Sequence, residues 1–337
     1  MSIITLVSAT GSPGVTTTAV GLACLWPSPA IVVEADPSGS SAMLAGYFGG
    51  FQPPPRTMID LVMARRAGHL AEEFPAALMP LPNTRAQVLP GPRSHAQARS
   101  ALDLWEALIP LWRLLGQATM TNSDRTTDAD RTAVDSGETT SALPDVRTDF
   151  LVDAGRLGMQ WSPEAVIRAS DLVILMTRCD LPSLAGAQQW TAAADERRRG
   201  HPEAPEWMVV TVGPPEPYTP HEIATAVGLP ILASLRHDPV GAAVYSHGRQ
   251  ARRRSPLRSD LTSLARSISD HLDERQRLLG GGARAGESPR PFSEPRSGPG
   301  GARAGESVDR RPFAAPPESV TPPRPPDPSD PTQTGGR

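Results

Sequence analysis

Residues 3–18 have the sequence IITLVSATGSPGVTTT, and its three parts differ in character. The run 3–8 is apolar and β-branched, so it predicts a buried strand. Glycines and a proline follow in residues 11–14 and predict a tight turn. Residues 15–26 then carry apolar groups at helical spacing, and Pro27 ends the helix. A strand, a glycine-rich turn and a helix in this order can bind a phosphate through backbone amides and the helix N-terminus.

Apolar runs and helical patterns alternate along the rest of the chain. Strands that are apolar throughout are typical of parallel sheets that helices cover on both faces. The sequence therefore predicts an α/β fold with a mostly parallel central sheet between two layers of helices. The predicted strands are 3–8, 30–33, 87–89, 149–152, 171–176, 207–212 and 230–235. The predicted helices are 15–26, 40–48, 57–67, 98–115, 163–169, 184–199, 222–226 and 257–272.

Composition divides the chain of 337 residues into one domain and two segments that cannot form a core. Residues 119–147 are rich in Thr, Asp, Ser and Arg and nearly lack apolar groups, so we predict a disordered insert. Residues 280–337 hold many of the 38 prolines and almost no large apolar side chains, so we predict a disordered Pro/Gly/Arg-rich tail. The remainder of residues 1–279 is long enough for one large α/β domain.

Charge and cysteine content exclude several classes of function. The net charge is −3, and all 33 basic residues are arginine, so no mechanism that depends on lysine is available. No apolar run is long enough to span a membrane, and residues 1–9 lack the basic leader of a signal peptide. Two distant cysteines, Cys24 and Cys179, give neither a disulfide framework nor a metal site. We therefore expect a cytoplasmic protein.

The turn and the helix start resemble the deviant Walker A loop of the ParA/MinD family of P-loop ATPases, which has the form KGGxGK[ST]T. The alignment places Thr10 at the family's signature lysine and Val15 at its P-loop lysine. Gly11 and Gly14 match family glycines, and Thr16 matches the residue whose hydroxyl holds Mg²⁺. The resemblance implies the three-layer P-loop NTPase-like α/β/α fold and a site for ATP or ADP with Mg²⁺. The cofactor-binding residues that it implies are Gly11, Ser12, Gly14, Val15, Thr16 and Thr17.

Three later segments match the family in the same order. The sequence VVEADP resembles switch I, DxDP, with Asp36 at the second aspartate and Glu34 in place of the first. The sequence FLVD resembles the Walker B strand, which implies that Asp153 lies near Mg²⁺. Residues 228–239 resemble the late strand and loop near the adenine. The implied metal ligands are Thr16, Asp36 and Asp153, and the implied catalytic residue is Asp36.

The absence of both lysines predicts weak or absent ATPase activity. A P-loop lysine neutralises charge on the β- and γ-phosphates, and Val15 offers neither a charge nor a hydrogen-bond donor. The cost should resemble the roughly 3–4 kcal/mol of a lost oxyanion donor. Backbone amides, Thr16 and Mg²⁺ can still hold a nucleotide, so loss of binding and retained weak binding both stay open. Arg156 is a conceivable substitute cation, although a solvated surface arginine is the commoner case.

Within the family, the chain resembles the TadZ/CpaE-like branch, in which a small residue often replaces the P-loop lysine. This resemblance implies a positioning or regulatory factor for a Tad/Flp-type pilus or secretion system, located in the cytoplasm, at the inner face of the membrane or at the cell pole. It also implies protein partners in that machine and a homodimer across the P-loop face. The alternatives are a slow ParA-type ATPase in chromosome or plasmid partitioning and a structural adaptor that binds no nucleotide.

Two further patterns have ordinary explanations. Arginine clusters at 197–199 and 249–254 raise DNA binding as a possibility, but charge runs usually form solvated faces and the net charge is negative, so we expect no DNA binding. The apolar stripe in 257–272 has the spacing of an amphipathic helix. The polar face of this helix mixes acidic residues and arginine, and the helix lacks Phe and Trp. These features favour core packing over binding to a membrane surface.

Overall fold

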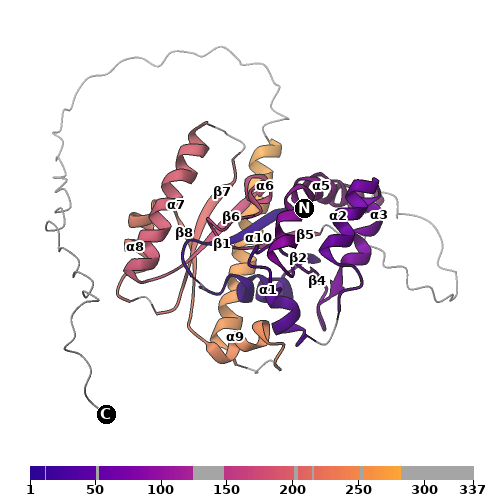
Figure 1. The fold of residues 1–337 in the computed structure, drawn as a ribbon. Helices are drawn as coiled ribbons and strands as arrows, with labels where there is room; N and C mark the ends of the chain where they lie inside the picture. The colour runs from indigo at the N-terminus through magenta and orange to yellow at the C-terminus, as the bar shows by residue number, and fades with distance from the viewer. Residues whose placement is uncertain are drawn as a thin grey trace, which may run out of the picture. The chain divides into compact units, whose positions relative to one another are not determined.

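A mostly parallel sheet lies at the centre of the fold (Figure 1). The computed structural model describes residues 1–11, 13–50, 53–123, 148–200, 204–214, 216–250 and 254–281. These residues form an eight-stranded sheet of order β3-β4-β2-β5-β1-β6-β7-β8. The strands are β1 (Ile3–Ser8), β2 (Ala30–Glu34), β3 (Met79–Pro80), β4 (Gln87–Leu89), β5 (Asp149–Arg156), β6 (Leu172–Arg178), β7 (Glu206–Val212) and β8 (Ile231–Leu235). Only the β3–β4 pair among them is antiparallel, so the predicted sheet is confirmed.

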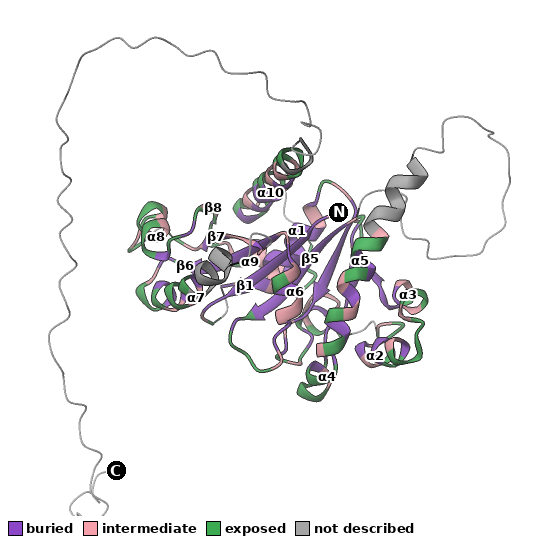
Figure 2. Ribbon diagram, turned by 90° about the horizontal axis from the view of Figure 1, so that it is seen from above, coloured by how far each residue is buried: buried purple, intermediate pink, exposed green. Residues whose placement is uncertain are grey.

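Helices cover both faces of this sheet and complete a three-layer α/β/α arrangement (Figures 1 and 2). The helices α1, α9 and α10 pack on one face, and α2 and α5 to α8 pack on the other. The helices are α1 (Val15–Leu25), α2 (Met58–Ala67), α3 (Leu70–Glu73), α4 (His95–Ser100), α5 (Leu102–Ser123), α6 (Glu164–Ala169), α7 (Leu181–Gly200), α8 (Pro220–Val227), α9 (Pro239–Ser246) and α10 (Pro256–Gly281), with a π-helix η1 (Met43–Tyr47) and a 3-10 helix η2 (Pro75–Ala77).

The alternation of side chains along β1 explains why this strand is apolar throughout. Ile4 and Leu6 join the hydrophobic cluster under α1 and α10. Ile3 and Val7 point to the opposite face and join the clusters under α5 and α7. Successive residues of a strand face opposite sides, so a strand covered on both sides must be apolar at every position.

The closing helix packs as the sequence predicts. The apolar stripe of α10 is buried in the cluster that α1 and the sheet share, which confirms core packing. The buried residues of the stripe are Leu257, Leu261, Leu264, Ile268 and Leu272. None of the described helices combines the length and hydropathy needed to cross a bilayer.

Several element boundaries differ from the prediction. The predicted helix 98–115 is two helices, α4 and α5, because the chain bends at Ala101, a fully buried residue whose N–H bonds back to Gln97 and Ala98. The predicted helix 40–48 is the π-helix η1. Helix α9 was not predicted, although Asp238 caps its N-terminus and Pro239 lies in its first turn, a combination that often begins a helix.

The two segments predicted to be disordered lie mostly outside the described residues. α5 continues to Ser123, so the start of the predicted insert 119–147 is helical. A helix can extend past its packed part because each added residue forms one more backbone hydrogen bond. The rest of the insert and the tail beyond Gly281 are outside the described ranges.

Candidate functional site

The β1–α1 turn places an uncapped helix N-terminus at the carboxyl edge of the sheet. Gly14 precedes α1 with φ of 89°, in the left-handed region that glycine adopts without strain. Its carbonyl accepts a hydrogen bond from the Thr18 N–H at 2.9 Å. Among the described residues, no side chain caps α1 and its first turn holds no acidic group. The first N–H groups of the helix therefore remain available to an anion.

Asp153 lies beneath this turn with one carboxylate oxygen unsatisfied. Its side chain is fully buried, and Oδ1 accepts a hydrogen bond from the Gly155 N–H at 3.1 Å. Oδ2 is buried without a hydrogen-bond partner among the described residues. Burial raises the pKa of Asp153 to about 7, and the charges of Asp36 and Glu34 add to the rise, while the Thr16 side chain and the Gly155 N–H oppose it. A buried carboxylate oxygen in this condition is suited to a cation.

Asp36 reaches the same place from the loop after β2. Its Oδ1 accepts a hydrogen bond from the Ser38 N–H at 2.8 Å, which fixes the carboxyl group. The carboxyl group lies directly against Gly155, where an added β-carbon would sit 2.4 Å from the carboxyl carbon. Gly155 also has φ of 65°, so both its conformation and its lack of a side chain let Asp36 approach.

These residues surround a cavity of about 370 Å³, which we call the phosphate cavity. It contains most of the predicted site: the residues that line it are Ser8, Gly14, Val15, Thr16, Thr17, Asp36, Gly155 and Arg156. Gly11 is exposed and is not among them, and Ser12 lies outside the described residues. Val15 lines the cavity while it also packs in the core cluster, so the residue that the resemblance aligns with the P-loop lysine is an apolar side chain at this cavity.

The oxygen donors at this cavity fit Mg²⁺. Thr16 and Asp36 line it, and Asp153 holds its unsatisfied oxygen nearby. Hard oxygen ligands of this kind suit Mg²⁺, which usually keeps several waters and binds one or two carboxylates together with phosphate oxygens. The described residues contain no group of three His, Cys, Asp or Glu side chains that could hold a metal alone.

Glu34 does not act at the cavity, in contrast to its alignment with the first switch I aspartate. Its Oε2 accepts hydrogen bonds from the Ser41 hydroxyl at 2.6 Å and the Gly91 N–H at 2.9 Å, and its Oε1 accepts one from the Met43 N–H at 3.0 Å. Burial raises its pKa. The carboxylate thus ties β2 to η1 and to the loop after β4, and it holds in place the segment that carries Asp36.

Thr10, which the resemblance aligns with the signature lysine, contacts α7 of its own chain. Its hydroxyl donates to the Ser183 hydroxyl at 3.4 Å, and its methyl group packs on Gly186 of α7, where a β-carbon would lie 2.4 Å away. The side chain therefore turns toward α7 and carries no charge.

A second cavity, of about 520 Å³, adjoins the first and shares Gly14 and Thr17 with it. It lies where β6, β7 and β8 end, and we call it the strand-end cavity. Of the predicted segment 228–239, only residues 235–239 line it; Gly228 instead ends α8. Together the two cavities extend along the carboxyl edge of the sheet, where open α/β sheets bind ligands.

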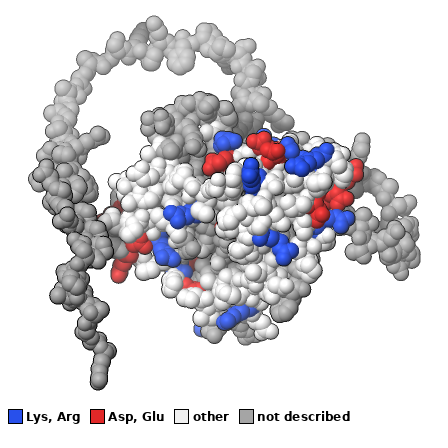
Figure 3. Space-filling model, in the orientation of Figure 1, with Lys and Arg blue, Asp and Glu red and all other residues white. Residues whose placement is uncertain are grey.

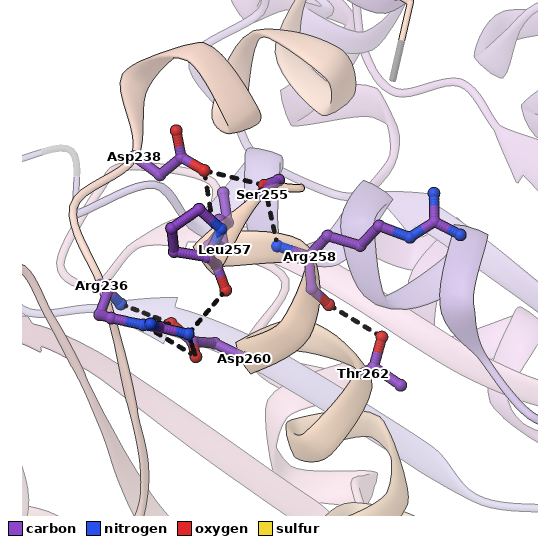
Figure 4. Close-up of polar contacts among 8 residues, drawn as sticks. Arg236, Asp238, Ser255, Leu257, Arg258, Asp260 and Thr262 are labelled. Atoms are coloured by element: carbon purple, nitrogen blue, oxygen red, sulfur yellow. Dashed lines mark hydrogen bonds and ion pairs between the residues drawn. The ribbon is translucent and has the colours of Figure 1, made fainter. Parts of the chain in front are cut away.

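Side chains of the β8 loop are anchored to the helices behind the strand-end cavity (Figure 4). Asp238 Oδ1 accepts a hydrogen bond from the Gly241 N–H at 2.8 Å and caps α9, while its Oδ2 accepts one from the Ser255 hydroxyl at 2.8 Å. Arg236 forms a bidentate ion pair with Asp260, with a shortest distance of 2.7 Å from its NH2 nitrogen to Oδ1. These contacts fix the wall of the cavity.

Comparison with known proteins identifies the fold. No protein-family profile matches the chain, and no curated protein sequence matches it. MinD from Pyrococcus furiosus is 16% identical, with a TM-score of 0.53 over 80% of this chain and 99% of that chain. A ParA family ATPase from Chlorobium tepidum is 13% identical, with a TM-score of 0.54 over 78% of this chain and 97% of that chain. The fold is that of the MinD and ParA ATPases.

MinD from Pyrococcus horikoshii, in a structure described as complexed with Mg-ADP, has the same fold. It is 16% identical to this chain, with a TM-score of 0.53 over 84% of this chain and 99% of that chain. At these identities the likeness to MinD and ParA proteins concerns the fold, and the chemistry of the site must be argued from this chain's own residues.

Sequence reasoning missed some residues of the site on this MinD/ParA fold. Gly155 lies two residues after Asp153, but its role depends on the approach of Asp36 from the loop after β2. Arg178 and Asp180 line the strand-end cavity just after β6. A signal for them was present, because residues that directly follow apolar strands lie at the ligand-binding edge of a parallel sheet.

The distribution of charged side chains on the surface is relevant to the expectation that this chain does not bind DNA. On the face drawn in Figure 3, arginine and acidic side chains are interspersed in the part that the structure describes. That part offers no extended basic surface of the kind that binds phosphate backbones. The side chains of 197–199 and the residues 251–253 are outside the description.

Proposed function

We propose that this chain is a nucleotide-binding positioning or regulatory factor whose ATP hydrolysis is weak or absent. The observation that carries the proposal is the phosphate cavity, which brings an uncapped helix N-terminus together with Asp36, while the unsatisfied oxygen of Asp153 is buried near Thr16 and Asp36. The same cavity presents Val15 at the position of the P-loop lysine. The site therefore has groups that hold phosphate and Mg²⁺ but lacks a lysine to neutralise the transferring phosphoryl group.

Each residue has a defined task in this proposal. The N–H groups at the start of α1 donate to phosphate oxygens. Thr16, Asp36 and Asp153 would hold Mg²⁺, and the ion would supply positive charge that balances the phosphates. The strand-end cavity takes the base, because it adjoins the phosphate cavity at Gly14 and Thr17.

Bound nucleotide then acts as a ligand that changes the surface of the protein. The loop that holds Asp36 lies against Gly155 near the end of β5, so a ligand bound at Asp36 would affect both segments. We propose that this surface contacts protein partners of a Tad/Flp-type pilus or secretion system in the cytoplasm, with a homodimer across the P-loop face. The TadZ/CpaE resemblance of the lysine-free loop supports this role.

Isothermal titration of the full chain with ATP and Mg²⁺, together with steady-state hydrolysis, tests the proposal. We expect nucleotide binding that requires Mg²⁺, with turnover far below that of a lysine-bearing ATPase of this fold assayed in parallel. Val15→Lys should raise both affinity and turnover, since it restores the missing charge next to Thr16. Rapid turnover by the wild-type chain would contradict the regulatory role.

Two other functions predict different results in two further assays. A partitioning ATPase would bind non-specific DNA with strong salt dependence, which a gel-shift assay at low salt measures. A structural adaptor would show no shift in melting temperature with nucleotide, whereas ligand at a hundred times its Kd should stabilise the fold by about 2.7 kcal/mol.

A further inference from the structure

Arg156 is the cation among the described residues that line the phosphate cavity. Its side chain is exposed, and it makes no hydrogen bond or ion pair with any residue that the structure describes. The other lining residues are glycine, valine, hydroxyl-bearing residues and Asp36. A guanidinium group that has no partner among the described residues is therefore present at a site where the loop supplies no charge.

The backbone of Arg156 is fixed beside the β1–α1 turn. β5 pairs with β1 so that Arg156 lies opposite Ser8, and the Leu157 N–H donates to the Ser8 carbonyl at 2.8 Å. Gly155, with φ of 65°, turns the chain immediately before it. The backbone of Arg156 thus has a fixed position at the carboxyl edge of the sheet, next to β1, the strand that leads into the β1–α1 turn.

The electrostatics of the cavity require a cation if it is to hold a polyphosphate. Asp36 lines the cavity, its charge and that of Glu34 add to the raised pKa of buried Asp153, and the charge of Asp36 adds to the raised pKa of Glu34. Phosphates brought next to these carboxyl groups would be repelled unless positive charge balances both. Mg²⁺ supplies part of this charge, and a guanidinium group is well shaped to bind phosphate oxygens with two N–H groups.

The other nearby arginines belong to the second cavity. Arg236 is engaged by Asp260 in a bidentate pair, and Arg178 lines the strand-end cavity at the end of β6. Neither lines the phosphate cavity.

We propose that Arg156 binds the phosphate groups of a nucleoside polyphosphate and supplies, from β5, the positive charge that Val15 and Thr10 do not. This inference deepens the proposed function and rests on it. In this arrangement the cation of the phosphate site lies on β5 and not in the β1–α1 turn. The charge is carried by a guanidinium group, which is always protonated.

Titration of the full-length chain with Mg·ATP tests the inference. Arg156→Ala should weaken binding by about tenfold or more, the range expected for a lost charge-assisted hydrogen bond. Arg66→Ala, which removes an exposed arginine on α2, is the matched control and should leave the affinity unchanged. Arg156→Lys should retain part of the affinity. The double variant Val15→Lys with Arg156→Ala should regain it, because lysine then returns the charge to the turn.

The outcomes separate the two proposals. If wild type binds Mg·ATP and Arg156→Ala binds within about twofold of it, the role of Arg156 is wrong and nucleotide binding stands. A loss that neither Arg156→Lys nor Val15→Lys relieves would show a structural role and also overturn the inference. Absence of binding by wild type itself would overturn both.

Discussion

At the scale of single residues, two positions on β5 determine the candidate site. Asp153 is buried with an unsatisfied oxygen, and Gly155 leaves room for the carboxyl group of Asp36. A buried acid with an unsatisfied oxygen costs stability in the absence of ligand, whereas Gly155 adopts its positive φ without strain. Costs of this kind are typical of residues kept for binding.

The stability of the ligand-free chain should fall as pH rises from about 4 to about 7. The pKa of Asp153 is about 7 in the folded chain and 3.8 is its ordinary value, so within this window the folded state keeps a proton that the unfolded state loses. Such a raised pKa lowers the free energy of unfolding with rising pH, here by up to about 4 kcal/mol, and the raised pKa of Glu34 acts in the same direction. Urea unfolding at several pH values without Mg²⁺ measures the slope.

Asp153→Asn provides the control for this slope. The amide cannot ionise, so the variant should lose most of the pH dependence and be more stable than wild type near pH 8. It should also bind Mg·ATP more weakly, because the anionic oxygen is gone. A slope that is the same in both proteins would show that Asp153 does not cause it.

Gly155→Ala should destabilise the fold and disturb the site. The methyl group would meet the Asp36 carboxyl group at 2.4 Å, and alanine is strained at φ of 65°. Gly68→Ala at the end of α2 is a matched control, because Gly68 has φ of 84° with open space around it. We expect about 1 kcal/mol of lost stability from the conformation alone and at least about 1 kcal/mol more at position 155. Chemical denaturation and Mg·ATP titration measure both effects, and equal losses in stability would contradict the contact with Asp36.

At the scale of elements, α10 completes the layer that holds α1 in place. The two helices pack together in one cluster with the sheet, and the start of α1 forms the phosphate cavity. Glu34 connects β2 to two other segments through three hydrogen bonds. Two of them come from Ser41 and Met43 at η1, and one comes from Gly91 in the loop after β4. The orientation of the site thus depends on elements that do not line it.

Leu264→Ala in α10 should lower the free energy of unfolding by about 2–5 kcal/mol, because Leu264 is fully buried and its truncation leaves a cavity. Ser263→Ala, one residue earlier and exposed, should change it by less than about 0.5 kcal/mol. Thermal and urea unfolding of both variants provide the comparison. A small effect of Leu264→Ala would show that α10 does not share the core.

At the scale of the whole molecule, one unit contains both the core and the candidate site. All three hydrophobic clusters and both cavities lie within Met1–Ala285. The two cavities meet at Gly14 and Thr17, so a nucleotide that spans them contacts the ends of strands from both halves of the sheet.

A chain that ends at Ala285 should therefore keep the stability and the Mg·ATP affinity of the full chain. Melting temperature and titration, with the full-length protein as control, test this. A loss of several degrees in melting temperature would show that residues after 285 contribute to the fold, and a loss of affinity alone would show that they contribute to the site.

The sequence by itself determined the α/β class, the parallel strands and the position of the turn before α1, because each depends on local periodicity and on glycines near one another in the chain. It also determined that residues 10 and 15 carry no charge. Only the tertiary structure decided that Asp36 lies on Gly155, that Glu34 is used as an anchor and that Arg156 faces the phosphate cavity. These relations join residues that are far apart in the chain, and strand order and register, which no local pattern specifies, bring them together.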